Sequence, residues 1–167
     1  SASNVTLTGQ DFIDFFNVMD ETDPTGGFVD YVDETEALSL GLLAVLNDGT
    51  VFMGADNTSV AASGRKSVRI ESKTQYTGGL FILDLAHMPE GCGTWPAFWS
   101  YGPSWPDSGE IDVIEGVNLQ SVVQTTLHTS DGCDMEGYDN FTGTWVDGSD
   151  GTPSNDCYID AAGQYSN

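Results

Sequence analysis

Short apolar runs, separated by Gly, Pro, Asn and Asp, follow one another along this chain. Such runs with turn residues between them predict strands at 28–32, 43–46, 51–54, 67–72, 78–86, 94–101, 109–117 and 122–129. The stretch 78–86 is almost wholly apolar, which predicts a central strand covered on both faces. Residues 8–17 instead carry Phe and Ile after Thr8 and predict a short amphipathic helix or turn. This succession predicts one all-β domain, a sandwich or a barrel.

The stretch 109–117 has the most unusual pattern, because three acidic residues alternate with Ile and Val. In a regular strand Glu110 and Asp112 point to one face and Glu115 points to the other. A β-bulge at 113–114 would add one residue and return Glu115 to the face of the other two. Acids gathered on one buried face repel each other, which is costly unless chemistry uses it. The pattern therefore predicts a glycoside-hydrolysing site, and the alternative is a solvated edge strand.

Aromatic residues are concentrated just before the acidic stretch, at Trp95, Trp99 and Trp105. Indole faces stack on the apolar faces of sugar rings, and indole N–H groups can bond hydroxyls. Trp105, in a loop between Ser and Pro, is the best candidate for a sugar platform, whereas the alternative for all three is a place in the core. His128, one hairpin after the acids, is either a structural hydrogen-bonding group or one that orients a carboxylate or a sugar hydroxyl. His87 is given no role.

The balance of charge narrows the possible partners. The chain has 26 acidic and 4 basic residues, a formal net charge of -22 at pH 7. Such a surface argues against binding to nucleic acid or to an anionic membrane. It suits a secreted protein that acts on a neutral polymer, although it also serves plain solubility. Neither a metal nor another cofactor is expected, because two His and no paired Cys spacing do not make a zinc site.

Modification signals agree with secretion, to the extracellular space or the cell wall. Three sequons, at Asn4, Asn57 and Asn140, could accept N-linked glycans in a secretory protein. An odd number of cysteines in a secreted chain leaves a free thiol or a missing partner. The cysteines are Cys92, Cys133 and Cys157.

Three stretches together resemble glycoside hydrolase family 16, and most closely its fungal laminarinase-like endo-β-1,3(4)-glucanases. They are WPAFW at 95–99, EIDVIEGVN at 110–118 and TTLHT at 125–129. The resemblance runs along nearly the whole chain, and the acidic run with its upstream tryptophans is its most specific part. The six-residue form of the acidic run is similar to that of laminarinases and some galactan hydrolases, whereas lichenases and wall transglycosylases have five residues.

The resemblance implies a concanavalin-like β-jelly-roll, a sandwich of two curved antiparallel sheets with the substrate across its concave face. Carried over residue by residue, Glu110 is the nucleophile, Glu115 is the general acid/base, and Asp112 adjusts the proton balance. The reaction would retain configuration through a covalent glycosyl-enzyme, with the two Glu carboxyls about 5 to 5.5 Å apart. Asn118 and His128 join the three tryptophans as expected substrate-binding residues.

Catalytic domains of the family are longer than this chain. The resemblance therefore implies a single domain over 1–167 that is truncated at its C-terminal end, one that a second chain completes, or a shortened variant with a repaired edge. The absent part would supply strands of both sheets and cover their edges. On this view Cys92 and Cys133, which flank the active strands, form a disulfide, and Cys157 has lost a downstream partner.

The expected function is retaining endo-hydrolysis of β-1,3-glucans and of mixed β-1,3/1,4- or 1,3/1,6-glucans, with the β-glucan as the polymeric partner. Two alternatives stay open, a glucan-binding or structural cell-wall protein derived from such an enzyme, and a galactan-directed hydrolase of the same family. Truncation argues for the binding protein. The intact acidic triplet argues for the enzyme, because a binding protein has little use for three converging carboxylates.

Overall fold

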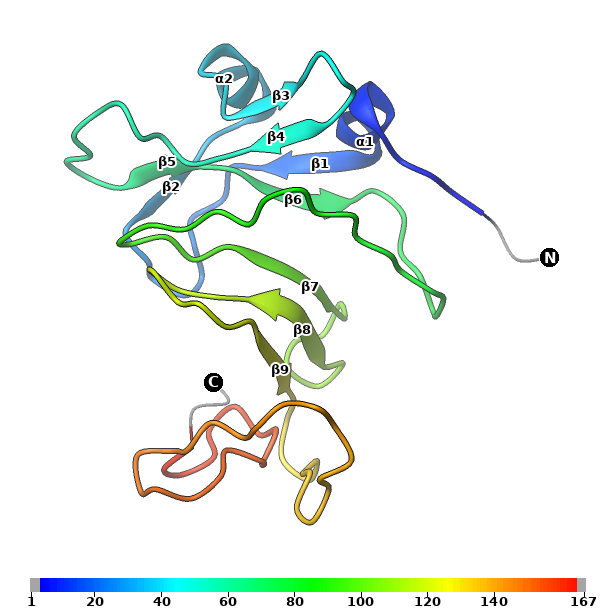
Figure 1. Cartoon of the computed structure of the whole chain (residues 1–167), viewed down its shortest axis with the longest axis vertical. Coiled ribbons are helices and arrows are strands. Elements are labelled where there is room, and N and C mark those ends of the chain that lie inside the picture. The colour runs from blue at the N-terminus through cyan, green and yellow to red at the C-terminus, as the bar shows by residue number, and fades with distance from the viewer. Residues whose placement is uncertain (1–3, 165–167) are drawn as a thin grey trace. The chain divides into compact units, whose positions relative to one another are not determined.

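The computed structural model describes residues 4–164, in a chain that divides into two compact units, Ser1–Leu85 and Ala86–Asn167. Strands are the main regular structure of the described residues, and helices are few and short (Figure 1). Within that range no helix has the length and apolar character needed to cross a membrane. Each unit has its own sheets, so the two are described in turn.

In the part that the structure describes, from residue 4 onward, the first unit contains two helices and six strands. They are α1 Gly9–Phe15, β1 Phe16–Met19, β2 Val29–Tyr31, α2 Glu34–Ser39, β3 Leu43–Val45, β4 Val51–Met53, β5 Arg65–Ser67 and β6 Arg69–Ser72. Antiparallel pairs join β1 to β6 and β3 to β4, and the β3–β4 hairpin turns at the Asn47-Asp48-Gly49 signal. The pair β2–β5 is parallel, which departs from the purely antiparallel sheets that the resemblance implied.

The helices show how local signals act in this unit. The helix predicted within 8–17 is confirmed, although Thr8 stands at its N-cap without a side-chain hydrogen bond and the chain becomes a strand at Phe16. The sequence interpretation missed α2. The residue that marks the start of α2 is Asp33, at its N-cap. The Asp33 carboxylate accepts a hydrogen bond of 2.8 Å from the backbone N–H of Glu36 and so satisfies one free donor of the first helical turn.

Apolar side chains from both helices, and from the segments around β2 and β3, form the core of the first unit. The buried members are Ile13, Val32, Ala37, Leu42 and Leu43. Five further apolar side chains are partly buried and pack against this core, namely Phe12, Val18, Val51, Met53 and Val68.

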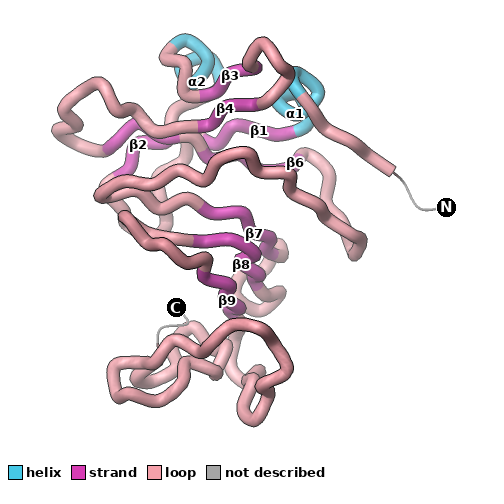
Figure 2. The backbone as a smooth tube through the Cα atoms, viewed as in Figure 1, coloured by secondary structure: helices cyan, strands magenta, loops and turns pink. Residues whose placement is uncertain are grey.

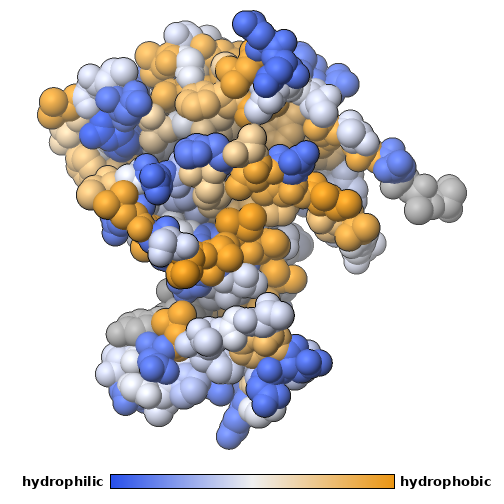
Figure 3. Space-filling model, viewed as in Figure 1, coloured by the Kyte–Doolittle hydropathy of each residue, from blue (hydrophilic) through white to orange (hydrophobic). Residues whose placement is uncertain are grey.

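The stretch 78–86 does not form the predicted central strand, and that prediction is wrong. The stretch has no strand assignment (Figure 2), and Leu80 and Ile82 are 86% and 81% exposed. Apolar side chains, coloured orange, are visible on the face that Figure 3 shows. An apolar run shows only that a segment suits burial, whereas a strand also needs hydrogen-bonding neighbours on its edges. The described residues supply no such neighbours here.

The second unit is built on a three-stranded antiparallel sheet. Its strands are β7 Ala97–Tyr101, β8 Glu110–Glu115 and β9 Gln124–His128, hydrogen-bonded in the order β7-β8-β9. They confirm the strands predicted within 94–101, 109–117 and 122–129. After β9 the chain continues as turns, loops and isolated bridges (Figure 2). The acidic strand is thus the central strand of this sheet.

Candidate active site

A β-bulge in β8 sets the direction of its acidic side chains. On β7, Trp99 lies opposite Asp112 while the preceding residue, Phe98, lies opposite Ile114. Val113 therefore has no counterpart on β7, and the register with β9 shifts in the same interval. The bulge predicted at 113–114 is confirmed by both neighbouring strands.

The bulge separates acids from aliphatic residues. Asp112 is only 1% exposed, and Glu110 and Glu115 are half-buried. Ile111 and Val113 are 49% and 46% exposed. Since side chains alternate between faces in a regular strand, one extra residue between Asp112 and Glu115 puts all three acids on one face.

The neighbouring strands place six residues against the acids. On the β7 side, Ala97, Trp99 and Tyr101 lie opposite Glu115, Asp112 and Glu110 respectively. On the β9 side, Gln124, Thr126 and His128 lie opposite the same three acids. The row of acids therefore has two aromatic residues and Ala97 along one edge and polar residues along the other.

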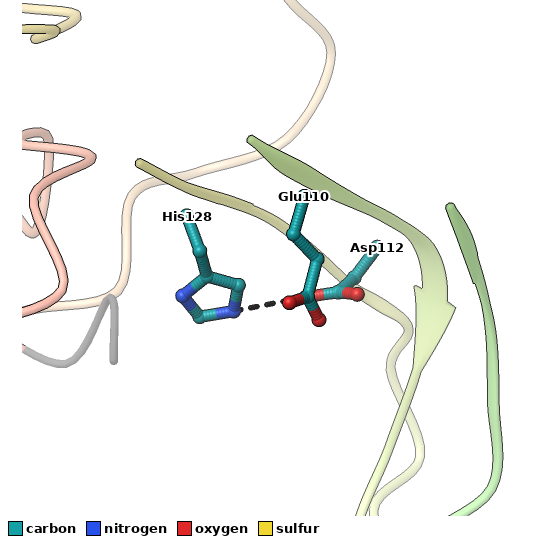
Figure 4. Close-up of side chains that lie close together, drawn as sticks. All are labelled: Glu110, Asp112 and His128. Carbon is teal, nitrogen blue, oxygen red and sulfur yellow. Dashed lines mark hydrogen bonds and ion pairs between the residues drawn. The ribbon is translucent and has the colours of Figure 1, made fainter. Parts of the chain in front are cut away.

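Asp112 and His128 form the most buried polar contact of the site. The His128 Nε2 atom lies 3.0 Å from Asp112 Oδ2, and both side chains are largely removed from solvent (Figure 4). A buried carboxylate is costly unless it is hydrogen-bonded, and the imidazole supplies that partner. His128 thus orients a carboxylate, which is one of the roles considered from the sequence.

Each of the two outer acids accepts a hydrogen bond from an indole. Trp105 Nε1 donates to Glu110 Oε2 at 2.5 Å, and Trp95 Nε1 donates to Glu115 Oε1 at 2.6 Å. Trp105 and Trp95 are themselves 50% and 59% exposed, so their ring faces remain open to a ligand. Both tryptophans therefore contact the acids and are available for stacking.

Burial is the main cause of the raised pKa values of Glu110 and Glu115. Burial raises the pKa of Glu110, and the charge of Asp112 raises this pKa further, whereas the hydrogen bond from Trp105 lowers it. Burial likewise raises the pKa of Glu115. The hydrogen bond from Trp95 lowers this pKa, and the charge of Asp112 gives a smaller increase. The charge of Asp112 is therefore only a secondary cause of the raised pKa of Glu115.

Two residues beside the acids were missed by the sequence interpretation. Tyr101 lies opposite Glu110 and stacks on Trp99, with ring centroids 5.0 Å apart and planes at 23°. Thr126 lies opposite Asp112, and its buried hydroxyl has no hydrogen-bond partner among the described residues. Strand alternation could have identified both residues, because Tyr101 lies two positions after Trp99 and Thr126 lies two positions before His128.

The loop that carries Trp105 is closed by backbone bonds. Gly102 N–H donates to the Gly109 carbonyl at 3.0 Å, and Ser108 N–H donates to the Ser104 carbonyl at 3.0 Å. A Cβ at Gly102 would lie 2.4 Å from the Ser108 side chain, so this position needs glycine. The closed loop brings Trp105 back to Glu110, five residues further along the chain.

Asn118, predicted as a substrate-binding residue, has a structural part in this site. Its side-chain Oδ1 accepts from Gly93 N–H at 2.7 Å, and its backbone N–H donates to the Thr94 carbonyl at 2.9 Å. Asn118 also has a φ of 56°, a left-handed conformation that Asn tolerates better than most residues. It ties the end of β8 to the loop before Trp95, and hence supports the contact of that indole with Glu115.

The cysteines do not pair as the resemblance suggested. All three are free thiols, and the expected disulfide between Cys92 and Cys133 is not formed. Cys133 instead lies beside Cys157, whose backbone N–H donates to the Cys133 carbonyl at 3.0 Å. The chain after β9 returns antiparallel to itself here, and spacing along the sequence does not reveal such a return.

One group of side chains has the chemistry of a cation site. Ligand atoms of Glu110, Asp112 and His128 lie within 4.8 Å of one another (Figure 4). The His128 ring is bonded to Asp112, and Glu110 accepts from Trp105, so these atoms already have partners. The group is explained by the acid site itself.

The family comparison covers nearly the whole chain. The family model described as the XgeA-like catalytic domain of glycoside hydrolase family 16 matches residues 16–166. The chain therefore belongs to this family of glycoside hydrolases.

Three fungal proteins are among the curated relatives of this chain. A probable glycosidase of Schizosaccharomyces pombe is 47% identical over 158 residues, which is 94% of this chain and 36% of that protein. A probable endo-1,3(4)-β-glucanase of Aspergillus fumigatus is 51% identical over 140 residues, covering 81% of this chain and 22% of that protein. The endo-1,3(4)-β-glucanase xgeA of Emericella nidulans is 46% identical over 151 residues, which cover 86% of this chain and 24% of that protein. The chain thus spans about a quarter to a third of these relatives.

Solved structures of the family establish the fold class. Laminarinase 16A of Phanerochaete chrysosporium, with β-glucans in its donor and acceptor sites, matches with a TM-score of 0.84 and 39% identity. A family 16 β-1,3-glucosyltransferase described as elongating matches with a TM-score of 0.81 and 44% identity. Both alignments cover 96% of this chain and 52% of the other. The predicted all-β jelly-roll class is confirmed, and the chain spans about half of these structures.

Proposed function

We propose that this chain carries the catalytic centre of a retaining endo-hydrolase of β-1,3-glucans and of mixed β-1,3/1,4- or 1,3/1,6-glucans. The observation that carries the proposal is the row on β8, where two half-buried glutamates flank a buried Asp112–His128 pair on one face. Glycoside hydrolysis needs two carboxyl groups on one side of a sugar, one protonated and one ionised. Named activities of the relatives support β-glucan as the substrate.

The reaction follows from this arrangement. Glu115, whose pKa burial raises, keeps its proton further up the pH range and gives it to the glycosidic oxygen. Glu110 attacks the anomeric carbon as the carboxylate, and the Trp105 N–H favours that ionised form. Water then enters with Glu115 as the base and releases the sugar, so that configuration is retained. The assignment of the two roles follows the family resemblance.

Asp112 and His128 support both steps without contacting the sugar in this scheme. The negative charge of Asp112 raises the pKa of both glutamates and so favours their protonated forms. The hydrogen bond from the imidazole holds the Asp112 carboxylate in place. The site thereby favours the singly protonated glutamate pair that hydrolysis requires.

The test is product release from laminarin and from a mixed-linkage glucan, with a galactan as the control substrate. We expect oligosaccharides of retained anomeric configuration from the glucans, measured by NMR at early times. Glu110→Gln should abolish release, by about 1,000-fold or more, and leave glucan affinity largely intact. Binding without release by the folded wild-type chain would favour a glucan-binding protein, and release from galactan alone would favour the galactan-directed hydrolase.

Transfer to a sugar acceptor is a second candidate activity of the same site. The observation that favours it is the 44% identity to an elongating β-1,3-glucosyltransferase. A covalent glycosyl-enzyme can be resolved by a sugar hydroxyl as well as by water, with the same acid/base. Products longer than the starting oligosaccharide, from a substrate of defined length, would identify transfer, whereas shorter products alone would identify hydrolysis.

We also propose that the protein is secreted, to the extracellular space or the cell wall. Support comes from the three sequon residues Asn4, Asn57 and Asn140, all of which lie exposed on the surface. A glycan needs such an exposed acceptor. A mass decrease on treatment with an N-glycan-removing enzyme, for protein collected from the native host's medium or wall, would agree with this location. Recovery of unglycosylated protein from the cell interior alone would contradict it.

A further inference from the structure

Cys133 and Cys157 lie opposite each other in the segment after β9. Asp134 and Asp156 form an antiparallel bridge, so the residues one step outward, Cys133 and Cys157, also face each other. The hydrogen bond from Cys157 N–H to the Cys133 carbonyl, 3.0 Å long, belongs to this pairing. Residues opposed at a hydrogen-bonded position have Cα atoms about 5.5 Å apart, which is within the range that a disulfide spans.

The two thiols have different surroundings. Cys157 is 4% exposed, whereas Cys133 is exposed to solvent. Burial, and then the charge and the hydrogen bond of the neighbouring Cys133 side chain, raise the pKa of Cys157 to about 11. Because the thiolate is the reactive form, a buried thiol of this kind is slow to attack a reagent from solution. An oxidant therefore meets Cys133 first.

We propose that Cys133 and Cys157 form a disulfide in the presence of a small-molecule disulfide such as oxidised glutathione. The Cys133 thiolate attacks the oxidant, one glutathione leaves as a thiol, and the other stays on Cys133. Cys157 then gives up its proton, attacks the Cys133 sulfur and displaces the second glutathione. The protein loses two electrons and two protons, which convert one glutathione disulfide into two thiols.

This cross-link would fix a segment that pairs with the end of β9. Thr129 N–H donates to the Cys157 carbonyl at 2.7 Å, and Ile159 N–H donates to the Thr129 carbonyl at 3.1 Å. Thr129 directly follows His128, the partner of Asp112. The disulfide would thus hold the 157–159 segment beside the strand that carries His128. Closing a loop of this size should raise Tm by roughly 5–10 °C.

A peptide map distinguishes this pairing from every other one. All four basic residues lie within 65–73, so trypsin leaves the three cysteines on one peptide. A protease that cleaves after Glu separates them onto peptides 91–110, 116–136 and 137–167. The chain, freed of N-linked glycans, is equilibrated in glutathione buffers of graded composition, its remaining thiols are alkylated, and the digest is analysed by mass spectrometry.

We expect peptide 116–136 to be joined to 137–167, with Cys92 alkylated. A link between 91–110 and 116–136, or three alkylated cysteines in the most oxidising buffer, would overturn the proposal. The order of attack is tested in a Cys92→Ser background. There Cys157→Ser should trap one glutathione on Cys133, whereas Cys133→Ser should leave Cys157 unmodified in the folded protein. Cys92→Ser alone is the control and should keep both the link and the difference in Tm between oxidised and reduced protein.

Discussion

Trp95 and Glu115 are joined by a hydrogen bond of 2.6 Å, which stabilises the ionised carboxylate and lowers the pKa that burial has raised. Trp95→Phe keeps an aromatic ring and removes the donor, so the pKa of Glu115 should rise. A general acid with a higher pKa stays protonated to higher pH, and the alkaline limb of kcat/KM should move upward. The measurement is a pH profile with laminarin.

The matched control for this change is Trp145→Phe. Trp145 packs edge-on against Phe141. The hydrogen bonds to Glu115 and Glu110 come from Trp95 and Trp105, so replacement of Trp145 should leave the pH profile unchanged. An alkaline limb that stays in place for Trp95→Phe while KM rises would show that Trp95 only stacks on the sugar and does not adjust Glu115.

His128 is the other residue whose effect can be isolated. His128→Ala removes the hydrogen-bond partner of Asp112, a carboxylate that is 1% exposed. A hydrogen bond to a charged group contributes about 1.5–3 kcal/mol, so kcat should fall roughly 10- to 100-fold and Tm should fall as well. Initial rates and thermal unfolding measure both effects. His87→Ala, at an exposed loop position, is the control, and equal losses in the two variants would contradict the assigned role.

At the scale of the element, the bulge of β8 decides whether the acids act together. Deletion of Val113 removes the extra residue and leaves all three acids in regular alternation on one face. Insertion of one Ala after Val113 allows regular alternation as well, but it moves Glu115 about 3.3 Å further from Glu110 along the strand, which separates the two carboxyl groups beyond the reach that hydrolysis needs. We expect the deletion to retain hydrolysis, reduced by on the order of 100-fold because the acids shift in position, and the insertion to abolish it. Circular dichroism checks that both variants fold, and activity confined to the insertion variant would refute this role of the bulge.

The C-terminal part of the second unit depends on few regular elements, and its bridges connect it to the end of β9. A segment held mainly by isolated bridges has little cooperative protection of its own. This is the structural reason for placing a cross-link at Cys133 and Cys157, where one bond would fix the returning chain.

At the scale of the whole molecule, the charge of -22 opposes folding through self-repulsion. Each of the four basic side chains already has a nearby partner. Lys66 pairs with Glu36, Arg69 pairs with Glu71, and Arg65 and Lys73 donate to backbone carbonyls. The acidic surface thus has little positive charge to compensate it.

Screening by salt should therefore stabilise the fold. The Debye length falls from about 30 Å at 0.01 M salt to a few ångströms near 1 M, so Tm should rise with NaCl concentration by roughly 3–6 °C over that range. Thermal unfolding at constant pH measures the effect. Sucrose at matching osmolality controls for exclusion from the protein surface, and a Tm that falls with NaCl would show that local ion pairs outweigh the general repulsion.

The sequence by itself determined the features that repeat over short distances. Strand positions around the acids, the hairpin between β3 and β4 and the bulge after Asp112 all follow from alternation and turn residues within a few positions. The acidic run and the tryptophans that precede it were also enough to identify the family. Alternation states which face of a strand a side chain occupies, so the odd spacing of Glu110 and Glu115 predicts a shared face only with a bulge between them.

The tertiary structure decided which groups meet. It paired Asp112 with His128, gave an indole donor to each glutamate and put Cys133 beside Cys157, not beside Cys92. It also left the apolar stretch 78–86 exposed in the described residues. These outcomes depend on which strands become neighbours and on what covers them. Such contacts join residues distant in sequence, and no local pattern specifies them.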